Sequence, residues 1–218
     1  MEDENRNILV KGANTFGIHL DKKSVEAFDL YLEEFLKWNQ KINLSAIRTE
    51  NGVVIKHFLD SLSVLPHLPN PSSLLDIGAG AGFPGIPLKI VEPSLKMTLI
   101  DSVRKKVDFQ NHIIRMLGLK EIRAIHGRVQ DTEILHSQGG QYDIVISRAF
   151  SDLQTLLLLG FPFLKKGGML LAMKGERDGE TVQSLSKSKE IPYRLIKTVP
   201  LILPFTSLKR TLFLFEKR

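Results

Sequence analysis

Apolar residues in the first 65 positions follow the spacing of helices. In residues 22–38 they recur every three or four positions, at Val25, Phe28, Leu32, Phe35 and Leu36. A second helical pattern begins at Val54 and stops before Pro66, and residues 38–44 predict a structured connection between the two. Because this periodicity gives each helix one apolar face, we predict a small helical unit at the N-terminus.

A different pattern begins after residues 66–73, which contain three prolines. Short apolar runs then alternate with amphipathic segments, which is typical of βαβ units in a mostly parallel sheet. The predicted strands are Ser73–Ile77, Lys96–Asp101, Ile122–His126, Tyr142–Ser147, Gly168–Lys174, Tyr193–Val199 and Thr211–Glu216. Helices are predicted near residues 85–91, 104–117, 151–163 and 176–186. Only residues 200–208 separate the last two strands, so we expect an antiparallel hairpin there. We divide the chain into a helical extension (residues 1–70) and an α/β domain (residues 71–218).

The chain of 218 residues contains no cysteine. This composition excludes disulfides, thiolate metal sites and a cysteine nucleophile. No apolar run approaches the roughly 20 residues of a membrane span, and the acidic N-terminal segment lacks the pattern of a secretory signal. We therefore expect a cytoplasmic, monomeric protein without a membrane anchor or a bound metal.

Basic residues are concentrated toward the C-terminus. Lys and Arg exceed Asp and Glu by six over the whole chain. Residues 151–218 hold 12 basic and six acidic residues, whereas residues 1–70 hold eight and ten. Such a surplus is compatible with a polyanionic partner such as RNA, although a solvated basic surface is the other interpretation.

A glycine-rich segment follows the first predicted strand. The strand carries Asp76, and four glycines follow within residues 78–85 before the next helix. Glycines at a strand–helix turn let the backbone bend tightly and approach a ligand. Residues 80–85 also match G-x-G-x-x-G, so a dinucleotide stays possible. Pro84, however, removes an N–H donor that a pyrophosphate would use. The cationic S-adenosyl-L-methionine tolerates that loss and favours a carboxylate such as Asp76.

Further candidates lie at the carboxyl ends of the predicted strands, the edge that lines the ligand crevice of a parallel sheet. Asp101 ends the second strand, 23 residues after Gly78. An acid at that position can accept hydrogen bonds from both ribose hydroxyls, or it can cap the next helix. Arg148 and Phe150 follow the fourth strand, and Lys174 ends the fifth. The Asn/Asp-Pro-Pro-aromatic tetrad that often accompanies exocyclic-amine methylation is absent from this chain.

Several motifs occur in a defined order. D-x-G-x-G-x-G-F-P-G-I-P-L (76–88) is followed by I-D-S (100–102), H-G-R-V (126–129), S-R-A-F (147–150) and M-K-G (173–175). Upstream, K-W-N (37–39), N-L (43–44) and H-F-L-D-S (57–61) belong to the same pattern. Over about residues 20–217 the chain resembles the glucose-inhibited division protein B family, the bacterial 16S rRNA guanine-N7 methyltransferases. The resemblance implies a Rossmann-like class I S-adenosylmethionine methyltransferase fold with a seven-stranded sheet.

The same resemblance implies which residues contact S-adenosyl-L-methionine. They are Gly78, Phe83, Val129, Gln130 and Arg148. The family often has an acid at position 130, and the amide of Gln130 can hydrogen-bond adenine but cannot act as a base. Together with the candidates above, the predicted cofactor site comprises Asp76, Gly78, Gly80, Gly82, Phe83, Asp101, Val129, Gln130 and Arg148.

Basic residues are the candidates for RNA contact. Arg128, Lys174 and Arg210 match basic positions of the family. We expect electrostatic RNA binding by Arg128, Lys165, Lys166, Lys209 and Arg210. The target base would be positioned by Arg148, Phe150 and Lys174.

The implied reaction needs no general base. Guanine N7 has an exposed lone pair, so alignment should supply most of the rate. We therefore assign no acid or base, and we expect Glu34, His57 and Asp60 to pair or pack within the helical unit. Three alternatives stay open: a methyltransferase for another RNA or a small molecule, a non-catalytic RNA-binding assembly factor, and an NAD(P) oxidoreductase.

Overall fold

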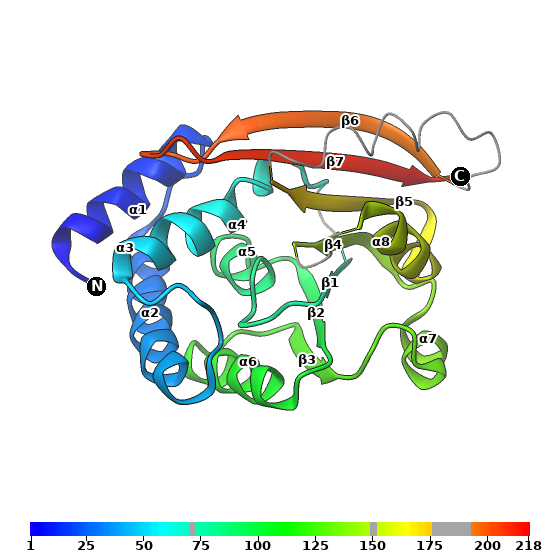
Figure 1. The fold of residues 1–218 in the computed structure, drawn as a ribbon, viewed down its shortest axis with the longest axis horizontal. Coiled ribbons are helices and arrows are strands. Elements are labelled where there is room, and N and C mark those ends of the chain that lie inside the picture. The colour runs from blue at the N-terminus through cyan, green and yellow to red at the C-terminus, as the bar shows by residue number, and fades with distance from the viewer. Residues whose placement is uncertain (70–72, 149–151, 176–192) are drawn as a thin grey trace.

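A seven-stranded sheet forms the centre of the molecule (Figure 1). The computed structural model describes residues 1–69, 73–148, 152–175 and 193–218, and the strands in these ranges lie in the order β3-β2-β1-β4-β5-β7-β6. They are β1 (Ser73–Ile77), β2 (Lys96–Asp101), β3 (Ile122–His126), β4 (Tyr142–Ser147), β5 (Leu164–Lys174), β6 (Tyr193–Ile202) and β7 (Lys209–Lys217). The first five strands are parallel, and β6 and β7 form an antiparallel hairpin. The predicted fold class is confirmed.

The strand order reverses between β1 and β4. In an open α/β sheet, the chain leaves two neighbouring strands in opposite directions at such a point, which opens a crevice at their carboxyl ends. The segments that follow β1, β2, β3 and β4 therefore surround one region of the molecule.

Helices cover both faces of the sheet. The N-terminal part contains α1 (Asp3–Thr15), α2 (Lys22–Ile42), α3 (Glu50–Val53), the π-helical turn η1 (Val54–Leu59), α4 (Asp60–Leu62) and the 3₁₀ turn η2 (Leu65–His67). The remaining helices are α5 (Gly85–Val91), α6 (Arg104–Met116), α7 (Thr132–Gln138), α8 (Leu153–Gly160) and the 3₁₀ turn η3 (Phe161–Phe163). Side chains alternate along each strand, so Leu74 packs with Leu88 of α5 on one face and Leu75 with Leu156 of α8 on the other.

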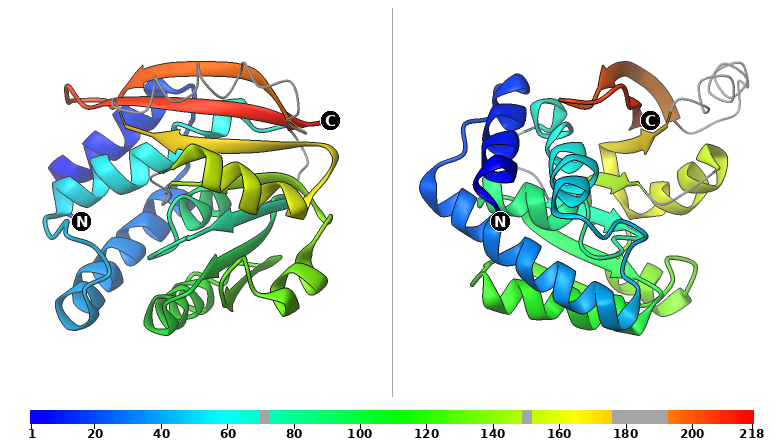
Figure 2. Two further views of the ribbon diagram at one scale, coloured as in Figure 1. Left: turned by 45° about the vertical axis from the view of Figure 1, so that its right-hand side comes forward. Right: turned by 60° about the vertical axis from the view of Figure 1, so that its left-hand side comes forward.

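The N-terminal helices share a hydrophobic core with the α/β part. Phe28, Phe35 and Phe58 are fully buried in one cluster with Phe109 of α6 and Ile86 of α5. Figure 2 shows these helices against one side of the sheet, with α8 on the opposite side. The helical extension therefore contributes part of the core that supports the sheet. None of the helices in the described ranges has the length and hydropathy of a membrane span.

The structure corrects several helix predictions. Helix α2 continues to Ile42, so residues 38–42 are helical and the connection begins at Asn43 with a positive φ of 51°. The prediction missed α1, whose buried side includes small residues that give a weak apolar pattern, such as Gly12 against Leu59. It also missed α7, a helix of seven residues. The helix predicted near residues 176–186 and Phe150 lie outside the described residues.

Candidate cofactor and RNA site

The turn after β1, residues 78–84, is called the glycine loop below. Gly78, Gly80 and Gly82 have φ values of 70°, 61° and 95°. Residues that carry a side chain rarely adopt this left-handed region of φ, so the three glycines let the chain turn between β1 and α5. At Gly82 a Cβ atom would also lie 2.9 Å from the hydroxyl of Tyr31.

Hydrogen bonds hold the glycine loop from several directions. The amides of Gly78 and Ala79 donate to the carbonyl of Ile100 at 2.8 and 3.1 Å. The amide of Gly80 donates to Asp101 Oδ2 at 2.8 Å, and its carbonyl accepts from Gln110 Nε2 at 2.7 Å. These bonds fix the loop to the carboxyl end of β2 and to α6.

A cavity of about 280 Å³ opens beside the glycine loop. It is lined by Ile77, Gly78, Ile100, Asp101, Ser102, Gly127, Arg128, Val129 and Gln130. The ends of β1, β2 and β3 thus bring together four residues of the predicted cofactor site, namely Gly78, Asp101, Val129 and Gln130. Arg128, predicted to contact RNA, lies among them.

Asp101 lies at the centre of this arrangement and is 6% exposed. Its Oδ2 accepts from the amide of Gly80, and its Oδ1 accepts from the amide of Val103 at 2.9 Å. A carboxylate offers about four lone-pair positions, so both oxygens retain one for a ligand. Asp101 therefore shapes the turn before α6 and can also accept hydrogen bonds from ribose hydroxyls.

The cavity suits the nucleoside part of S-adenosyl-L-methionine. Its volume is close to the lower end of the roughly 300–1,000 Å³ range of small-molecule sites. Asp101 offers an acceptor for hydroxyl groups, Gln130 offers an exposed amide, and Ile77, Ile100 and Val129 offer an apolar wall. The residues present therefore fit the predicted cofactor.

Asp76 lies beneath the glycine loop, outside the residues that line this cavity. Its side chain is fully buried, and Oδ2 accepts from the amide of Gly85 at 2.9 Å. Since Pro84 has no N–H, this bond serves the first amide of α5. Burial raises the pKa of Asp76 to about 7. Asp76 thus supports the turn from below through Oδ2, while its buried Oδ1 has no hydrogen-bond partner among the described residues.

The ring of Phe83 also points away from the cavity. It is 3% exposed and stacks on His57, with ring centroids 4.5 Å apart and planes 13° apart. The ring of Tyr31 lies 5.3 Å away on a similar plane. Phe83 therefore joins the glycine loop to α2 and η1.

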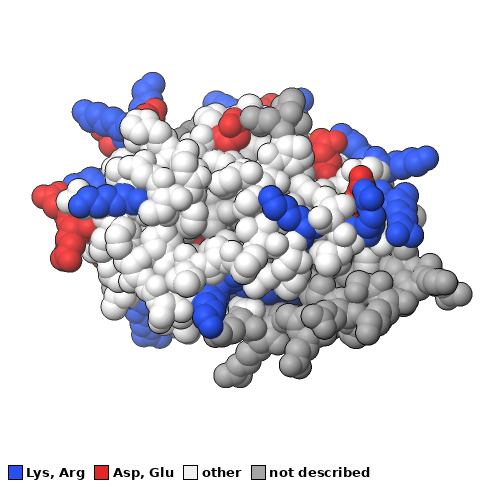
Figure 3. Space-filling model, turned by 90° about the horizontal axis from the view of Figure 1, so that it is seen from above, with Lys and Arg blue, Asp and Glu red and all other residues white. Residues whose placement is uncertain are grey.

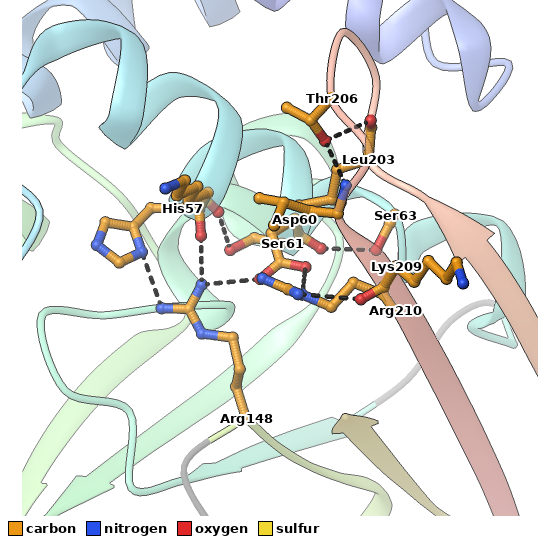
Figure 4. Close-up of polar contacts among 11 residues, drawn as sticks. His57, Asp60, Ser61, Ser63, Arg148, Leu203, Thr206, Lys209 and Arg210 are labelled. Carbon is orange, nitrogen blue, oxygen red and sulfur yellow. Dashed lines mark hydrogen bonds and ion pairs between the residues drawn. The ribbon is translucent and has the colours of Figure 1, made fainter. Parts of the chain in front are cut away.

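Arg148, which follows β4, is held by η1 and α4 (Figure 4). Nη1 donates to the carbonyl of Lys56 at 3.1 Å and to Asp60 Oδ2 at 3.3 Å, and Nη2 donates to His57 Nδ1 at 3.1 Å. Arg210 of β7 donates from Nε to Asp60 Oδ1 at 3.0 Å. One buried carboxylate thus binds two guanidinium groups from different parts of the sheet, and the cluster keeps a net positive charge.

The contacts of His57 define its protonation state. An arginine can only donate, so Nδ1 must be an acceptor and the proton of the neutral ring lies on Nε2. Nε2 then donates to Ser45 Oγ at 2.9 Å. Burial and the nearby charge of Arg148 lower the pKa of His57 to about 3. The imidazole is therefore neutral at physiological pH, and both of its nitrogens are engaged.

The predicted RNA-binding residues lie at opposite ends of the strands, some at the carboxyl ends of the parallel strands and some at their amino ends. Lys174, at the end of β5, and Lys209 and Arg210, at the start of the antiparallel β7, belong to the carboxyl edge beside the crevice. Lys165 and Lys166 lie at the start of β5, on the amino edge. The predicted RNA-binding residues are therefore not gathered in one place, because the length of β5 separates Lys165 and Lys166 from Lys174.

The structure adds residues that the sequence analysis did not place at the site. The hydroxyl of Tyr31 in α2 donates to the carbonyl of Ala81 at 2.5 Å, and Gln110 in α6 binds Gly80. His57 and Asp60, expected only to pair or pack, do so with Arg148. These contacts link segments 30 to 91 positions apart, so local spacing gave no signal for them.

Solved structures show which fold the protein has. A SAM-dependent methyltransferase from Aquifex aeolicus superposes with a TM-score of 0.57 at 18% identity, over 75% of this chain and 92% of that one. TYW2 from M. jannaschii, solved with AdoMet, gives a TM-score of 0.53 at 19% identity, over 67% and 69%. The fold is that of class I S-adenosylmethionine methyltransferases.

The sequence comparisons then identify the family. The family model described as rRNA small subunit methyltransferase G matches residues 24–203. Ribosomal RNA small subunit methyltransferase G of Geotalea uraniireducens is 40% identical over 100% of this chain and 99% of its own length. The protein of the same name from Acetivibrio thermocellus is 39% identical over 97% and 88%. The chain belongs to the rRNA small subunit methyltransferase G family, which confirms the predicted family and cofactor, S-adenosyl-L-methionine.

Proposed function

We propose that this protein transfers a methyl group from S-adenosyl-L-methionine to N7 of a guanine in 16S rRNA. The observation that carries the choice of N7 is the state of the acid–base groups around the crevice. Both ring nitrogens of His57 are engaged, and Asp60 binds two arginines. Asp76 is buried and bonded to Gly85. These three groups are engaged with other parts of the protein, and the carboxylate that lines the cavity, Asp101, is assigned to the ribose hydroxyls of the cofactor.

Methylation of guanine N7 needs no such group. The N7 lone pair can attack directly, so the enzyme must only align the two reactants. When bound, S-adenosyl-L-methionine supplies an electrophilic methyl group. Asp101 and Gln130 would hold its nucleoside part in the cavity, while the tethered glycine loop keeps the backbone beside it in place. The rate would come from this rigid placement.

Positive charge would hold the RNA at the carboxyl edge of the sheet. Arg128 lies on the rim of the cofactor cavity with an exposed side chain. Arg148 and Arg210 share Asp60, so the cluster has one positive charge more than its carboxylate neutralises. Lys209 lies beside Arg210 on β7. Phosphate groups of the RNA would be attracted to the carboxyl ends of the strands. The substrate would be rRNA, and the reaction would take place in the cytoplasm.

A methyl-transfer assay tests the proposal. The protein would be incubated with labelled S-adenosyl-L-methionine and, separately, 30S particles, deproteinised 16S rRNA, 23S rRNA and tRNA. We expect label in 16S rRNA, and chain cleavage by borohydride and aniline, which is specific for N7-methylguanine, at one guanine. Label on a different base atom would contradict the N7 assignment. Cofactor binding without transfer to any RNA would favour a non-catalytic assembly factor instead.

A binding measurement tests the cofactor assignment separately. Calorimetric titration with S-adenosyl-L-methionine and with NADH compares the two ligands that the glycine motif leaves open. We expect saturable binding of S-adenosyl-L-methionine alone. Binding of NADH in its place would overturn the proposal.

A further inference from the structure

The molecule has a second cavity at the edge of the sheet opposite the cofactor cavity. Its volume is about 540 Å³, and its lining includes His67, Asp143, Lys165, Lys166, Lys197 and Glu216. The residues come from η2, the start of β4, the start of β5 and the hairpin of β6 and β7. Lys165 and Lys166 were predicted from the sequence to contact RNA, but the family comparison and the reaction proposed above assign no role to the cavity itself.

A bulge in β5 pushes two of these lysines outward. Between its pairs with Tyr142 and Ile144, β4 advances two residues, while β5 advances five, from Leu164 to Met169. The three additional residues make a bulge, and Gly167 within it has a φ of 75°. Bulges re-aim side chains at sheet edges. Lys165 and Lys166 are therefore presented beside the cavity and not along the strand.

The carboxylates of this cavity are already neutralised by nearby cations. Asp143 Oδ1 accepts from Lys165 Nζ at 2.7 Å, and Glu216 Oε2 accepts from Arg194 at 2.6 Å. Burial acts to raise the pKa of Asp143, but bonds from Lys165 and Ser73 outweigh it and lower that pKa to about 2. The Lys165 pair thus persists at physiological pH.

Two positive charges are left over. Lys166 and Lys197 make no ion pair with any described residue. Burial lowers the pKa of the half-buried His67, and the nearby positive charge of Lys197 lowers it further. Seen from the β6–β7 side, Figure 3 shows Lys and Arg side chains at the end of the molecule that carries the C-terminus, beside fewer acidic ones. The cavity is therefore an open, electropositive surface.

We infer that this cavity is a second contact for the phosphate backbone of the RNA substrate, remote from the methylated base. This inference rests on the proposed function. Lysines act as point charges toward phosphates and do not need the convergent geometry of a small-ligand site. The five steps from Met169 to Lys174 alone span about 17 Å, so the two edges would touch different parts of the RNA. The substrate would then be a large folded rRNA or ribosomal particle.

Charge reversal tests the contribution to binding. In the double variant Lys166→Glu, Lys197→Glu, we expect kcat/KM on 16S rRNA to fall roughly tenfold and its salt dependence to weaken by one to two phosphate contacts. The Kd for S-adenosyl-L-methionine should not change. The matched control, Lys11→Glu, Lys23→Glu, makes the same change in net charge at exposed lysines on α1 and α2. An equal fall in both variants would show a general charge effect and overturn the inference.

The absence of cysteine allows a direct test of position. An iron chelate attached to Lys197→Cys would generate hydroxyl radicals that cut nearby RNA, and Val103→Cys beside the cofactor cavity gives the reference pattern. We expect Lys197→Cys to cut 16S rRNA at nucleotides distinct from those near Val103→Cys, and Lys23→Cys to cut none. Cuts from Val103→Cys without any from Lys197→Cys would overturn the inference.

Other results separate this inference from its foundation. If the wild type transfers no methyl group to any RNA, the proposed function fails first. If it methylates 16S rRNA and the double variant matches it in kcat/KM and salt dependence, only the second contact fails. If inorganic phosphate binds the cavity and the double variant still matches the wild type on RNA, the cavity is a small-anion site and the inference is overturned.

Discussion

The glycine loop and the π-helical turn η1 meet where Phe83 of the loop stacks on His57 of η1, and the two are stabilised in different ways. The loop is held mainly through its backbone, with Gly78 and Ala79 bonded to Ile100 and Gly80 bonded to Asp101. The turn η1 and the adjoining α4 are held by charge, because Arg148 binds His57, the carbonyl of Lys56 and Asp60. The side of the crevice that holds the cofactor cavity and the side proposed to meet RNA thus depend on different kinds of interaction.

This difference assigns separate tasks to the two parts of the chain. A backbone cradle can hold a cofactor with few side chains, so most of its requirements are for glycine and one carboxylate. The charged cluster gathers Asp60, Arg148 and Arg210 from segments up to 150 positions apart. It therefore forms only when the helical extension and the last strands are both in place. The helical extension accordingly contributes Asp60 and His57 to the charged cluster.

Removing the shared carboxylate of the charged cluster should have the largest effect. Asp60→Ala would leave Arg148 and Arg210 facing each other without a counter-ion. Breaking a buried ion pair costs about 3–5 kcal/mol, and these arginines, each 23% exposed, can partly rehydrate. We expect the free energy of unfolding in urea to fall by about 3 kcal/mol, with the Kd for S-adenosyl-L-methionine changed less than threefold.

The ion pair of Asp143 and Lys165 provides the matched control. It joins β4 to β5 with side chains 38% and 47% exposed. Exposed pairs contribute about 0–1 kcal/mol, so Asp143→Ala should cost much less than Asp60→Ala. Equal losses in the two variants would show that Asp60 has no special place between the two regions.

Asp101→Ala, in contrast to Asp60→Ala, should mainly weaken the binding of S-adenosyl-L-methionine. It removes the acceptor for the amides of Gly80 and Val103 together with the acceptor proposed for the ribose. Hydrogen bonds to charged groups contribute about 1.5–3 kcal/mol each, so we expect the Kd for S-adenosyl-L-methionine to rise about 100-fold. Calorimetric titration measures it. Asp108→Ala, at an exposed position of α6, should keep the wild-type Kd, and a similar Kd in both variants would remove Asp101 from the cofactor site.

The same division explains what the sequence could predict. Each of the seven predicted strands is present, because strands that are buried on both faces of the sheet, such as β1, β2 and β4, leave short continuous apolar runs in the sequence. Gly78, Asp101, Val129 and Gln130 line one cavity because each follows a parallel strand, and the carboxyl ends of neighbouring strands meet. Local patterns and one topological rule were therefore enough to bring these four residues to one cavity.

Long-range side-chain contacts were beyond such rules. Phe83 was predicted to contact the cofactor, and in the structure its ring stacks on His57 and Tyr31 of the helical extension. Lys165 and Lys166 were grouped with Lys174 by sequence proximity, yet the length of β5 puts them at opposite edges. Neither outcome can be read from spacing, since each depends on how distant elements pack.

Tyr31 connects the two regions, and Tyr31→Phe tests that connection with a smaller effect. The change would leave the carbonyl of Ala81 buried without its donor while keeping the ring against Phe83. An unsatisfied buried group costs about 1–3 kcal/mol, so we expect the KM for S-adenosyl-L-methionine to rise about tenfold with the KM for RNA unchanged. Steady-state kinetics at saturating partner substrate separates the two.

Tyr142→Phe is the control for that measurement. The hydroxyl of Tyr142 is also buried and bonded, to Gln138 Oε1 at 2.6 Å, but it lies at the start of β4. Its loss should lower stability without changing either KM. If both variants raise the KM for S-adenosyl-L-methionine equally, Tyr31 acts through general stability and does not position the loop.

The smallest net effect is expected from pH, because two buried groups have strongly shifted pKa values, Asp76 below the glycine loop and His57 in η1, and the two shifts act in opposite directions. The pKa of His57 falls from its usual 6.5 to about 3, so the unfolded chain binds the extra proton between these values and stability is lost as pH falls. The pKa of Asp76 rises from its usual 3.8 to about 7, so the folded chain binds the extra proton and stability is lost as pH rises. Over pH 4–6.5 the two contributions offset each other.

Single variants should reveal how each group alone makes the free energy of unfolding depend on pH. In Asp76→Asn, which keeps an acceptor for Gly85 but does not titrate, only the His57 slope remains, so stability should rise more steeply with pH between 4 and 6.5 than in the wild type. In His57→Gln only the Asp76 slope remains, so stability should fall over the same range. Urea unfolding at several pH values measures both. Parallel curves for the two variants would mean that these groups do not titrate as their burial requires, and the contrast between loop and turn would then lose its electrostatic part.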